Sequence, residues 1–177
     1  KGSLAMYALK DYIGEDKLNA ALKSYVQKVA YQEPPYTTSI EFVDYLRKAT
    51  PDSLQYLIKD LFETITLYGN ETKKATYKAN ANNTFTVSMD IAADKFRSDS
   101  LGVETKIPFK DWIDVGVYAK GKNDKDTLIY LQKHLISKPQ QTILVTVTQQ
   151  PTKCGIDPLH ILIDRDSDDN TKTVSKE

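Results

Sequence analysis

The stretch Thr84-Phe85-Thr86-Val87-Ser88-Met89-Asp90-Ile91 alternates polar and apolar residues without a break. Successive side chains of a β-strand point to opposite faces, so this stretch predicts a strand with one buried face. The other face of the strand is expected to contact water. The side chains predicted to point inward are those of Phe85, Val87, Met89 and Ile91.

Further strand patterns lie on both sides of this stretch and are separated by turn signals rich in Asn, Gly and Pro. Short strands at intervals of about ten residues favour an antiparallel sandwich over a parallel sheet, which needs helices between its strands. From Asp164 onward apolar residues almost vanish, so residues 166–177 are expected to form a frayed polar tail. The additional strands are predicted at residues 73–79, 103–108, 112–119, 127–136, 142–148 and 156–163.

The chain before residue 69 has a helical period instead. A capping box at Thr38 to Glu41 and a stop at Gly14 support these helices, and Thr50 is expected to cap a fourth helix that starts at Pro51. Gly69-Asn70 reads as a turn between the two kinds of structure. The sequence thus predicts an α+β protein with a helical part at 1–68 and an antiparallel β-sandwich at 69–165. The first three helices are predicted over residues 3–13, 16–30 and 40–49.

The composition limits the classes of partner that this chain is expected to bind. The 177 residues carry 24 basic and 24 acidic side chains, so no bulk charge favours nucleic acid or an anionic membrane surface. No apolar run reaches the roughly 20 residues of a membrane span, and the start lacks the pattern of a signal peptide. We therefore expect no nucleic-acid partner and no membrane contact from this segment. The single cysteine, Cys154, excludes an intramolecular disulfide and leaves the compartment open.

No self-sufficient active site is recognisable. A zinc hydrolase needs ligands that converge on one ion, but His134 and His160 lie far apart and no H-E-x-x-H motif occurs. Cys154 has neither histidine near it in sequence, so we interpret it as a structural residue. Signatures of a serine nucleophile, a P-loop and a dinucleotide fold are also missing. We assign no catalytic, cofactor-binding or metal-binding residue in this chain.

Asp164, Asp166 and Asp168 have the spacing by which a calcium loop presents carboxylate oxygens. Position 6 of that loop would be Asp169 instead of glycine, and position 12 would be Ser175 instead of glutamate. A solvated acidic tail is the favoured interpretation, and calcium binding is left open. Two glycosylation sequons, which start at Asn70 and Asn82, and clustered tyrosines in the helical part are too unspecific to assign a role.

Several segments resemble the gluzincin (M1) zinc aminopeptidases. In that family a tyrosine linked to transition-state stabilisation stands two positions before a Lys-Gly pair, and Lys1-Gly2 is similar to that pair. The chain more closely resembles the C-terminal ends of bacterial proteins in which an M1-type domain is fused behind an ABC-transporter permease. The matching segments are Met6-Tyr7-Ala8-Leu9-Lys10-Asp11-Tyr12-Ile13-Gly14-Glu15, Glu33-Pro34-Pro35-Tyr36, Pro51-Asp52-Ser53-Leu54-Gln55-Tyr56-Leu57-Ile58, Ile156-Asp157-Pro158 and Leu162-Ile163-Asp164-Arg165.

The resemblance implies that residues 1–68 are the helical end of a thermolysin-like catalytic domain and that the sandwich follows it. The zinc ion, its ligands and the catalytic tyrosine would then belong upstream, so that only Lys1 and Gly2 match part of a motif. The chain would be a non-catalytic C-terminal portion whose partner is the upstream catalytic domain of the same polypeptide. The parent would be a bacterial aminopeptidase acting on peptides, in the periplasm or at a membrane.

An alternative hypothesis from a different class is a stand-alone module in which helices and a sandwich bind a protein or a carbohydrate. The first predicted helix separates the two hypotheses. A helix that belongs to a larger domain should expose apolar side chains, including Leu4, Tyr7 and Ala8, whereas a stand-alone module should be polar there.

Overall fold

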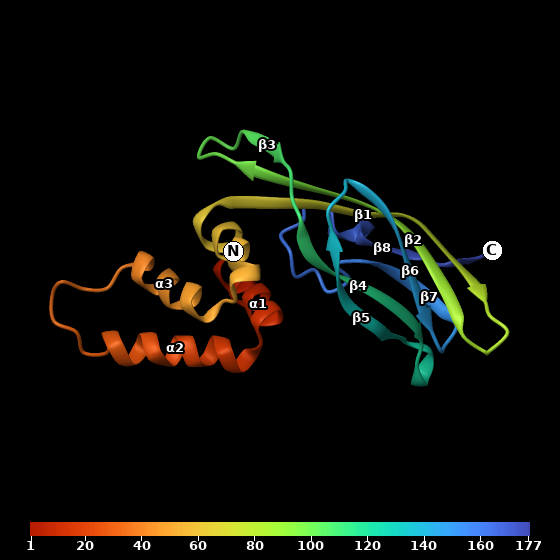
Figure 1. Cartoon of the computed structure of the whole chain (residues 1–177), viewed down its shortest axis with the longest axis horizontal. Helices are drawn as coiled ribbons and strands as arrows, with labels where there is room; N and C mark the ends of the chain where they lie inside the picture. Colours follow the sequence, from red (N-terminus) through yellow and green to blue (C-terminus); the bar gives the residue numbers. More distant parts are fainter. The chain divides into compact units, whose positions relative to one another are not determined.

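The computed structural model describes all 177 residues, and they form two compact units, Lys1–Thr66 and Leu67–Glu177 (Figure 1). The first unit is helical and the second is built from strands, so the fold is mixed α+β, as predicted. The division falls two residues before the predicted boundary after residue 68. None of the helices combines the length and hydropathy that a membrane-spanning helix needs.

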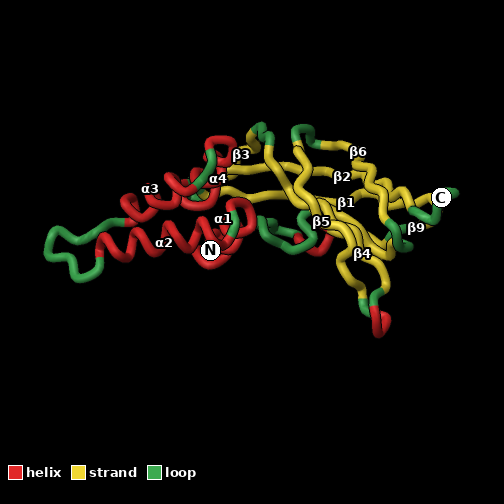
Figure 2. Tube along the Cα trace, turned by 60° about the horizontal axis from the view of Figure 1, so that its bottom comes forward, coloured by secondary structure: helices red, strands yellow, loops and turns green.

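The helical unit is built around a small aliphatic core contributed by several helices. Gly14, with φ of 91°, separates the first two helices, and its N–H donates to the carbonyl of Lys10 at 2.8 Å. Leu9, Leu46 and Ile58 are fully buried between the helices. The elements, red in Figure 2, are α1 (Gly2–Ile13), α2 (Glu15–Val29), α3 (Ser39–Ala49), η1 (Asp52–Leu54), α4 (Gln55–Ile58) and η2 (Lys59–Glu63).

The predicted caps are only partly correct. Thr38 accepts the backbone N–H of Glu41 at 3.4 Å, whereas the Glu41 carboxylate accepts from the Thr37 hydroxyl at 2.8 Å. The prediction that Thr50 caps a fourth helix starting at Pro51 was wrong. Thr50 is buried and donates its hydroxyl to the carbonyl of Leu46 at 2.8 Å, a bond that threonine commonly makes to the preceding turn.

The second unit consists of two sheets. One sheet has the order β3-β2-β1-β9, and β6 also pairs with β2 in this sheet. The other sheet has the order β5-β4-β7-β8. The pairs β2–β3, β2–β6, β4–β5, β4–β7 and β7–β8 are antiparallel, and β1 and β9 run parallel. The strands are β1 (Ile65–Ala79), β2 (Phe85–Ser98), β3 (Glu104–Ile107), β4 (Asp111–Lys120), β5 (Asp126–Ile136), β6 (Gln140–Val147), β7 (Pro151–Ile156), β8 (Thr171–Thr173) and β9 (Ser175–Lys176).

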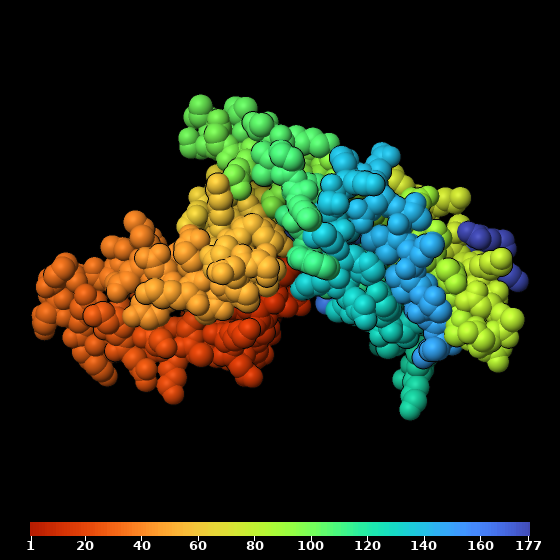
Figure 3. Space-filling model, in the orientation of Figure 1, coloured from red at the N-terminus to blue at the C-terminus, as the bar shows by residue number.

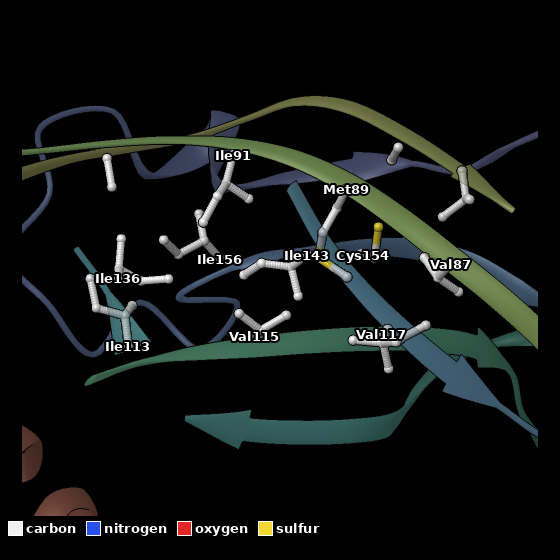
Figure 4. Close-up of a cluster of buried hydrophobic side chains, with 14 of the residues drawn as sticks. Val87, Met89, Ile91, Ile113, Val115, Val117, Ile136, Ile143, Cys154 and Ile156 are labelled. Carbon is white, nitrogen blue, oxygen red and sulfur yellow. The ribbon is translucent and has the colours of Figure 1, made fainter. Parts of the chain in front are cut away.

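The predicted alternation in β2 is confirmed. Val87, Met89 and Ile91 are buried, and the residues between them are partly exposed. Figure 4 shows these side chains pointing toward Val117 and Ile156 of the other sheet. The two sheets therefore share one core, whose other members include Ile113, Val115, Ile136, Ile143, Val145 and Cys154.

Two local assignments from the sequence, one turn and one strand, were wrong. Gly69 and Asn70 lie inside β1, because pairing with the neighbouring strand outweighs the local turn preference. The strand predicted over 156–163 does not form there: β7 ends at Ile156, the first residue of that range, and Asp157 adopts a φ of 43°. The Asp157 carboxylate accepts the N–H groups of Ile161 and Leu162 at 2.9 and 3.0 Å, which closes a turn there.

The prediction of a frayed tail over 166–177 was also wrong. The segment contains a short 3-10 helix, η4 (Ser167–Asn170), followed by β8 and β9. β8 pairs with β7 in one sheet and β9 pairs with β1 in the other. Backbone hydrogen bonds and the buried Val174 order this segment although it has few apolar residues.

A buried ion pair extends the inward side of β2. Lys95 has the same place in the alternation of β2 as Val87 and Ile91, and it is buried. Its Nζ lies 2.7 Å from Oδ2 of Asp111. The same oxygen accepts the Tyr68 hydroxyl at 2.9 Å. The Lys95 ammonium also lies 5.4 Å from the centre of the Tyr68 ring. The charge of Asp111 is thus compensated by a cation and by a neutral donor.

We predict that Lys95→Met destabilises the protein by about 3 kcal/mol, because Asp111 would be left buried without its cation. Lys106→Met is the control, since Lys106 pairs with the partly exposed Asp94 and such pairs contribute about 1 kcal/mol or less. Urea unfolding followed by circular dichroism measures both. Equal effects of the two substitutions would contradict the assignment of the Lys95 pair as a buried structural interaction.

Candidate functional site

The residues that match the family motif make only local contacts. Lys1 precedes α1, and its Nζ donates to the carbonyl of Thr64 at 2.9 Å. A side chain at Gly2 would meet no atom within 4 Å. Lys1 thus connects the start of α1 to the end of η2.

The two histidines and the cysteine occupy separate environments. His134 lies on β5, where its Nε2 is 2.8 Å from the Tyr130 hydroxyl, and burial lowers the pKa of this imidazole. His160 is exposed in the turn after β7, with a φ of 53°. Cys154 is fully buried in the sheet core (Figure 4). No group of three or more His, Cys, Asp or Glu side chains is arranged to hold a metal ion.

The three aspartates with calcium-like spacing take different roles. The Asp164 carboxylate accepts the N–H of Asn70 at 2.7 Å and the N–H of Asp166 at 3.2 Å. Asp166 and Asp168 are exposed. Asp164 therefore stabilises the backbone of β1 and of its own turn. These hydrogen bonds account for the position of one of the three carboxylates without a bound ion.

The connection between β7 and β8 is the main polar feature that the sequence analysis missed. Burial raises the pKa of Asp157 to about 7, although the two backbone N–H groups that it accepts favour the charged form. The charges of Asp114 and Asp164 raise it further. Asp-Pro directly after a strand is a turn signal, and Asp157-Pro158 was the local clue.

The same connection brings two distant backbones close together. A Cβ at Gly155 would lie 2.0 Å from the carbonyl oxygen of Asn170, so only glycine fits against the returning chain. That carbonyl accepts the Thr72 hydroxyl at 2.6 Å. The segment from Asp157 to Asn170 thus links β7 to β1 through hydrogen bonds.

A polar cavity of about 430 Å³ lies against β1, β2 and β3. Its cations are paired: Lys106 lies 2.6 Å from Asp94, Arg165 pairs with Glu104, and Lys73 pairs with Glu71. The ring of Phe96 contributes an apolar patch. The other charged residues that line the cavity are Asp164, Asp166 and Asp169.

The outer face of α1 is the candidate interaction surface. Leu4 and Tyr7, one helical turn apart, are 51% and 62% exposed, while Leu9 and Ile13 on the opposite side are buried. Ala8, which was expected to belong to the exposed patch, is buried. A second apolar feature of the same unit is a groove of about 250 Å³ lined by Ile40, Val43 and Phe62, among others. Both features could contact another protein domain.

The remaining sequence patterns also have defined positions. Asn70 is only 1% exposed, so its sequon is buried, whereas Asn82 is exposed in the turn before β2. Tyr25 packs edge-on against Phe42 and Tyr45 in the helical unit. Tyr25 therefore serves packing and does not form an open stacking surface.

No protein-family model matches this sequence, and no curated protein matches it significantly.

We predict that Cys154 does not react with a thiol reagent in the native protein, because burial raises the pKa of its thiol to about 12. One equivalent should react after denaturation in guanidinium chloride. The absorbance of released thionitrobenzoate measures both states. Rapid reaction of the native protein would show that the core opens frequently.

We predict that Asp157 makes stability fall as the pH rises. Its pKa is raised from 3.8 to about 7 in the folded protein, so the folded state binds a proton that the unfolded state has lost. Its stabilising contribution is complete below about pH 3.8 and is lost as the pH rises through about 7. Between these two pH values the free energy of unfolding should fall with a slope that approaches about 1.4 kcal/mol per pH unit.

The comparison with Asp157→Asn isolates this effect, because asparagine keeps one acceptor oxygen and does not titrate. Urea unfolding of both proteins at several pH values gives the difference in free energy of unfolding. We expect the advantage of the wild type to shrink toward pH 7. A difference that stays constant with pH would mean that the pKa of Asp157 is the same in the folded and unfolded states.

Proposed function

We propose that this chain is a non-catalytic supporting portion of a zinc-dependent aminopeptidase-like protein. The parent would remove N-terminal residues from peptides, and its zinc ion and catalytic groups would lie in a different part of the polypeptide. The residues 1–68 would complete a thermolysin-like catalytic domain. The resemblance of several segments to M1 enzymes motivates this assignment.

The exposed apolar face of α1 carries the proposal. An amphipathic helix in an isolated unit normally turns its apolar stripe inward, and α1 does so with Ala5, Leu9 and Ile13. Leu4 and Tyr7 extend the apolar character to the outer side. A contact with a neighbouring domain would remove both side chains from water and would stabilise the pair of domains by the hydrophobic effect.

A second candidate function is a stand-alone binding module for a protein or a carbohydrate. The polar cavity beside β1, β2 and β3 favours it, because carboxylates and the Phe96 ring provide both polar and apolar contacts for a ligand. This function would not require Leu4 and Tyr7 to be covered. The two candidates therefore differ in what they expect of α1.

We predict that the polypeptide encoded by the full open reading frame binds one zinc ion and cleaves aminoacyl reporter substrates, whereas the 177-residue chain does neither. Metal analysis and a chromogenic aminopeptidase assay measure this difference. Tight stoichiometric zinc binding by the 177-residue chain alone would refute the proposal.

The double substitution Leu4→Asp, Tyr7→Asp provides the structural test. In the longer polypeptide it should cost about 2 kcal/mol or more, because charges would be buried at a domain contact. In the 177-residue chain the cost should be within about 0.5 kcal/mol, since both positions are exposed. Val26→Asp, at an exposed apolar position of α2, is the control. Equal costs in both polypeptides would favour the stand-alone module.

A further inference from the structure

The strand β6 lies at the edge of its sheet and has one hydrogen-bonded neighbour. It pairs antiparallel with β2, from Phe85 opposite Val147 to Ala92 opposite Gln140. No other strand pairs with β6. Figure 3 shows this segment in light blue at the surface of the two-sheet unit. The side of β6 away from β2 is therefore an open edge.

The ladder determines which backbone groups face the open edge. The N–H of Ala93 donates to the carbonyl of Pro139 at 3.0 Å, so these residues form a hydrogen-bonded pair at the end of the ladder. Bonded and non-bonded pairs alternate in an antiparallel ladder. The N–H and C=O groups of Ile143 and Val145 therefore point to β2. Those of Gln140, Thr142, Leu144 and Thr146 point away from it.

The composition of β6 does not protect this edge. Residues 140–150 contain no charged residue, no glycine and no proline. Natural edge strands are usually short or carry charged residues that discourage pairing with another chain. The other edge strands of this unit follow that rule, because β3, β8 and β9 are short and β5 carries Asp126 and Lys133.

The side chains of β6 are complementary to themselves in one antiparallel register. With a two-fold axis at Leu144, this residue lies opposite its own copy, and Thr142 lies opposite Thr146. Thr142, Leu144 and Thr146 are exposed, with Leu144 at 66%, so their partners can approach from solvent. The buried Ile143 would lie opposite Val145. Pairs of β-branched and aliphatic residues stabilise such ladders.

We propose that β6 pairs with β6 of a second copy of this chain about a two-fold axis at Leu144. The hydrogen-bonded pairs in this register are Leu144 with Leu144 and Thr142 with Thr146, whose free N–H and C=O groups face the open edge. The register thus matches both the side chains and the backbone. The contact is isologous and closes as a dimer, because each β6 has one open side.

Sedimentation velocity of the 177-residue protein over a range of concentrations tests the proposal. The expected result is a reversible monomer–dimer equilibrium with no larger species. Leu144→Lys should weaken the dimer at least tenfold, because two ammonium groups would meet at the axis. Leu101→Lys is the control, since Leu101 is also exposed but lies in a loop before β3. Circular dichroism verifies that both variants fold.

A cysteine variant tests the register. Hydrogen-bonded residues in antiparallel strands have Cα atoms about 5.5 Å apart, a distance that a disulfide can span. Leu144→Cys should therefore form a covalent dimer under mild oxidation, and Leu101→Cys should not. The native Cys154 is buried and does not interfere. A monomer at all concentrations, open-ended oligomers, an unchanged Leu144→Lys dimer or a failure of Leu144→Cys to cross-link would each overturn the proposal.

Discussion

The structure of the strand-rich unit depends on the burial of one face of β2. Val87, Met89 and Ile91 are removed from water almost completely, and each such side chain contributes about 1.5–3 kcal/mol. Because β2 pairs with β1, with β3 and with β6, its inner face determines where the rest of its sheet lies. The second sheet supplies Val115, Val117 and Ile156 to cover that face (Figure 4).

Polar groups complete this core where aliphatic side chains end. Lys95 continues the inward side of β2 and pairs with Asp111, whose same carboxylate oxygen also accepts the Tyr68 hydroxyl. Asp157 instead uses its carboxylate to hold a turn, and burial raises its pKa. Such groups stabilise less by themselves than an equal volume of apolar atoms, but removing one partner leaves the other buried and unpaired. They therefore fix the geometry of the chain near the ends of β2 and β7.

The sequence contained local signals for most helices and strands. It did not show where contacts with distant residues override those local signals. The alternation in β2 and the stop at Gly14 depend on neighbouring residues, so both could be predicted locally. Strand pairing that overrides the turn preference of Gly69-Asn70, and the ordering of residues 166–177 by β7 and β1, depend on distant residues. Lys95 and Asp111 could have been suspected, since each is charged at an inward position. The candidate site was less predictable, because Ala8 proved to be buried beside the exposed Leu4 and Tyr7.

Because its inner face carries the shared core, we expect β2 to be the most stable element of the strand-rich unit. Native-state hydrogen exchange, measured by NMR at increasing denaturant concentration, determines the stability of each strand. We expect the amides of Val87 and Met89 to exchange only through global unfolding, with the same free energy as the whole unit. Exchange of these amides while β4 and β7 remain protected would contradict it.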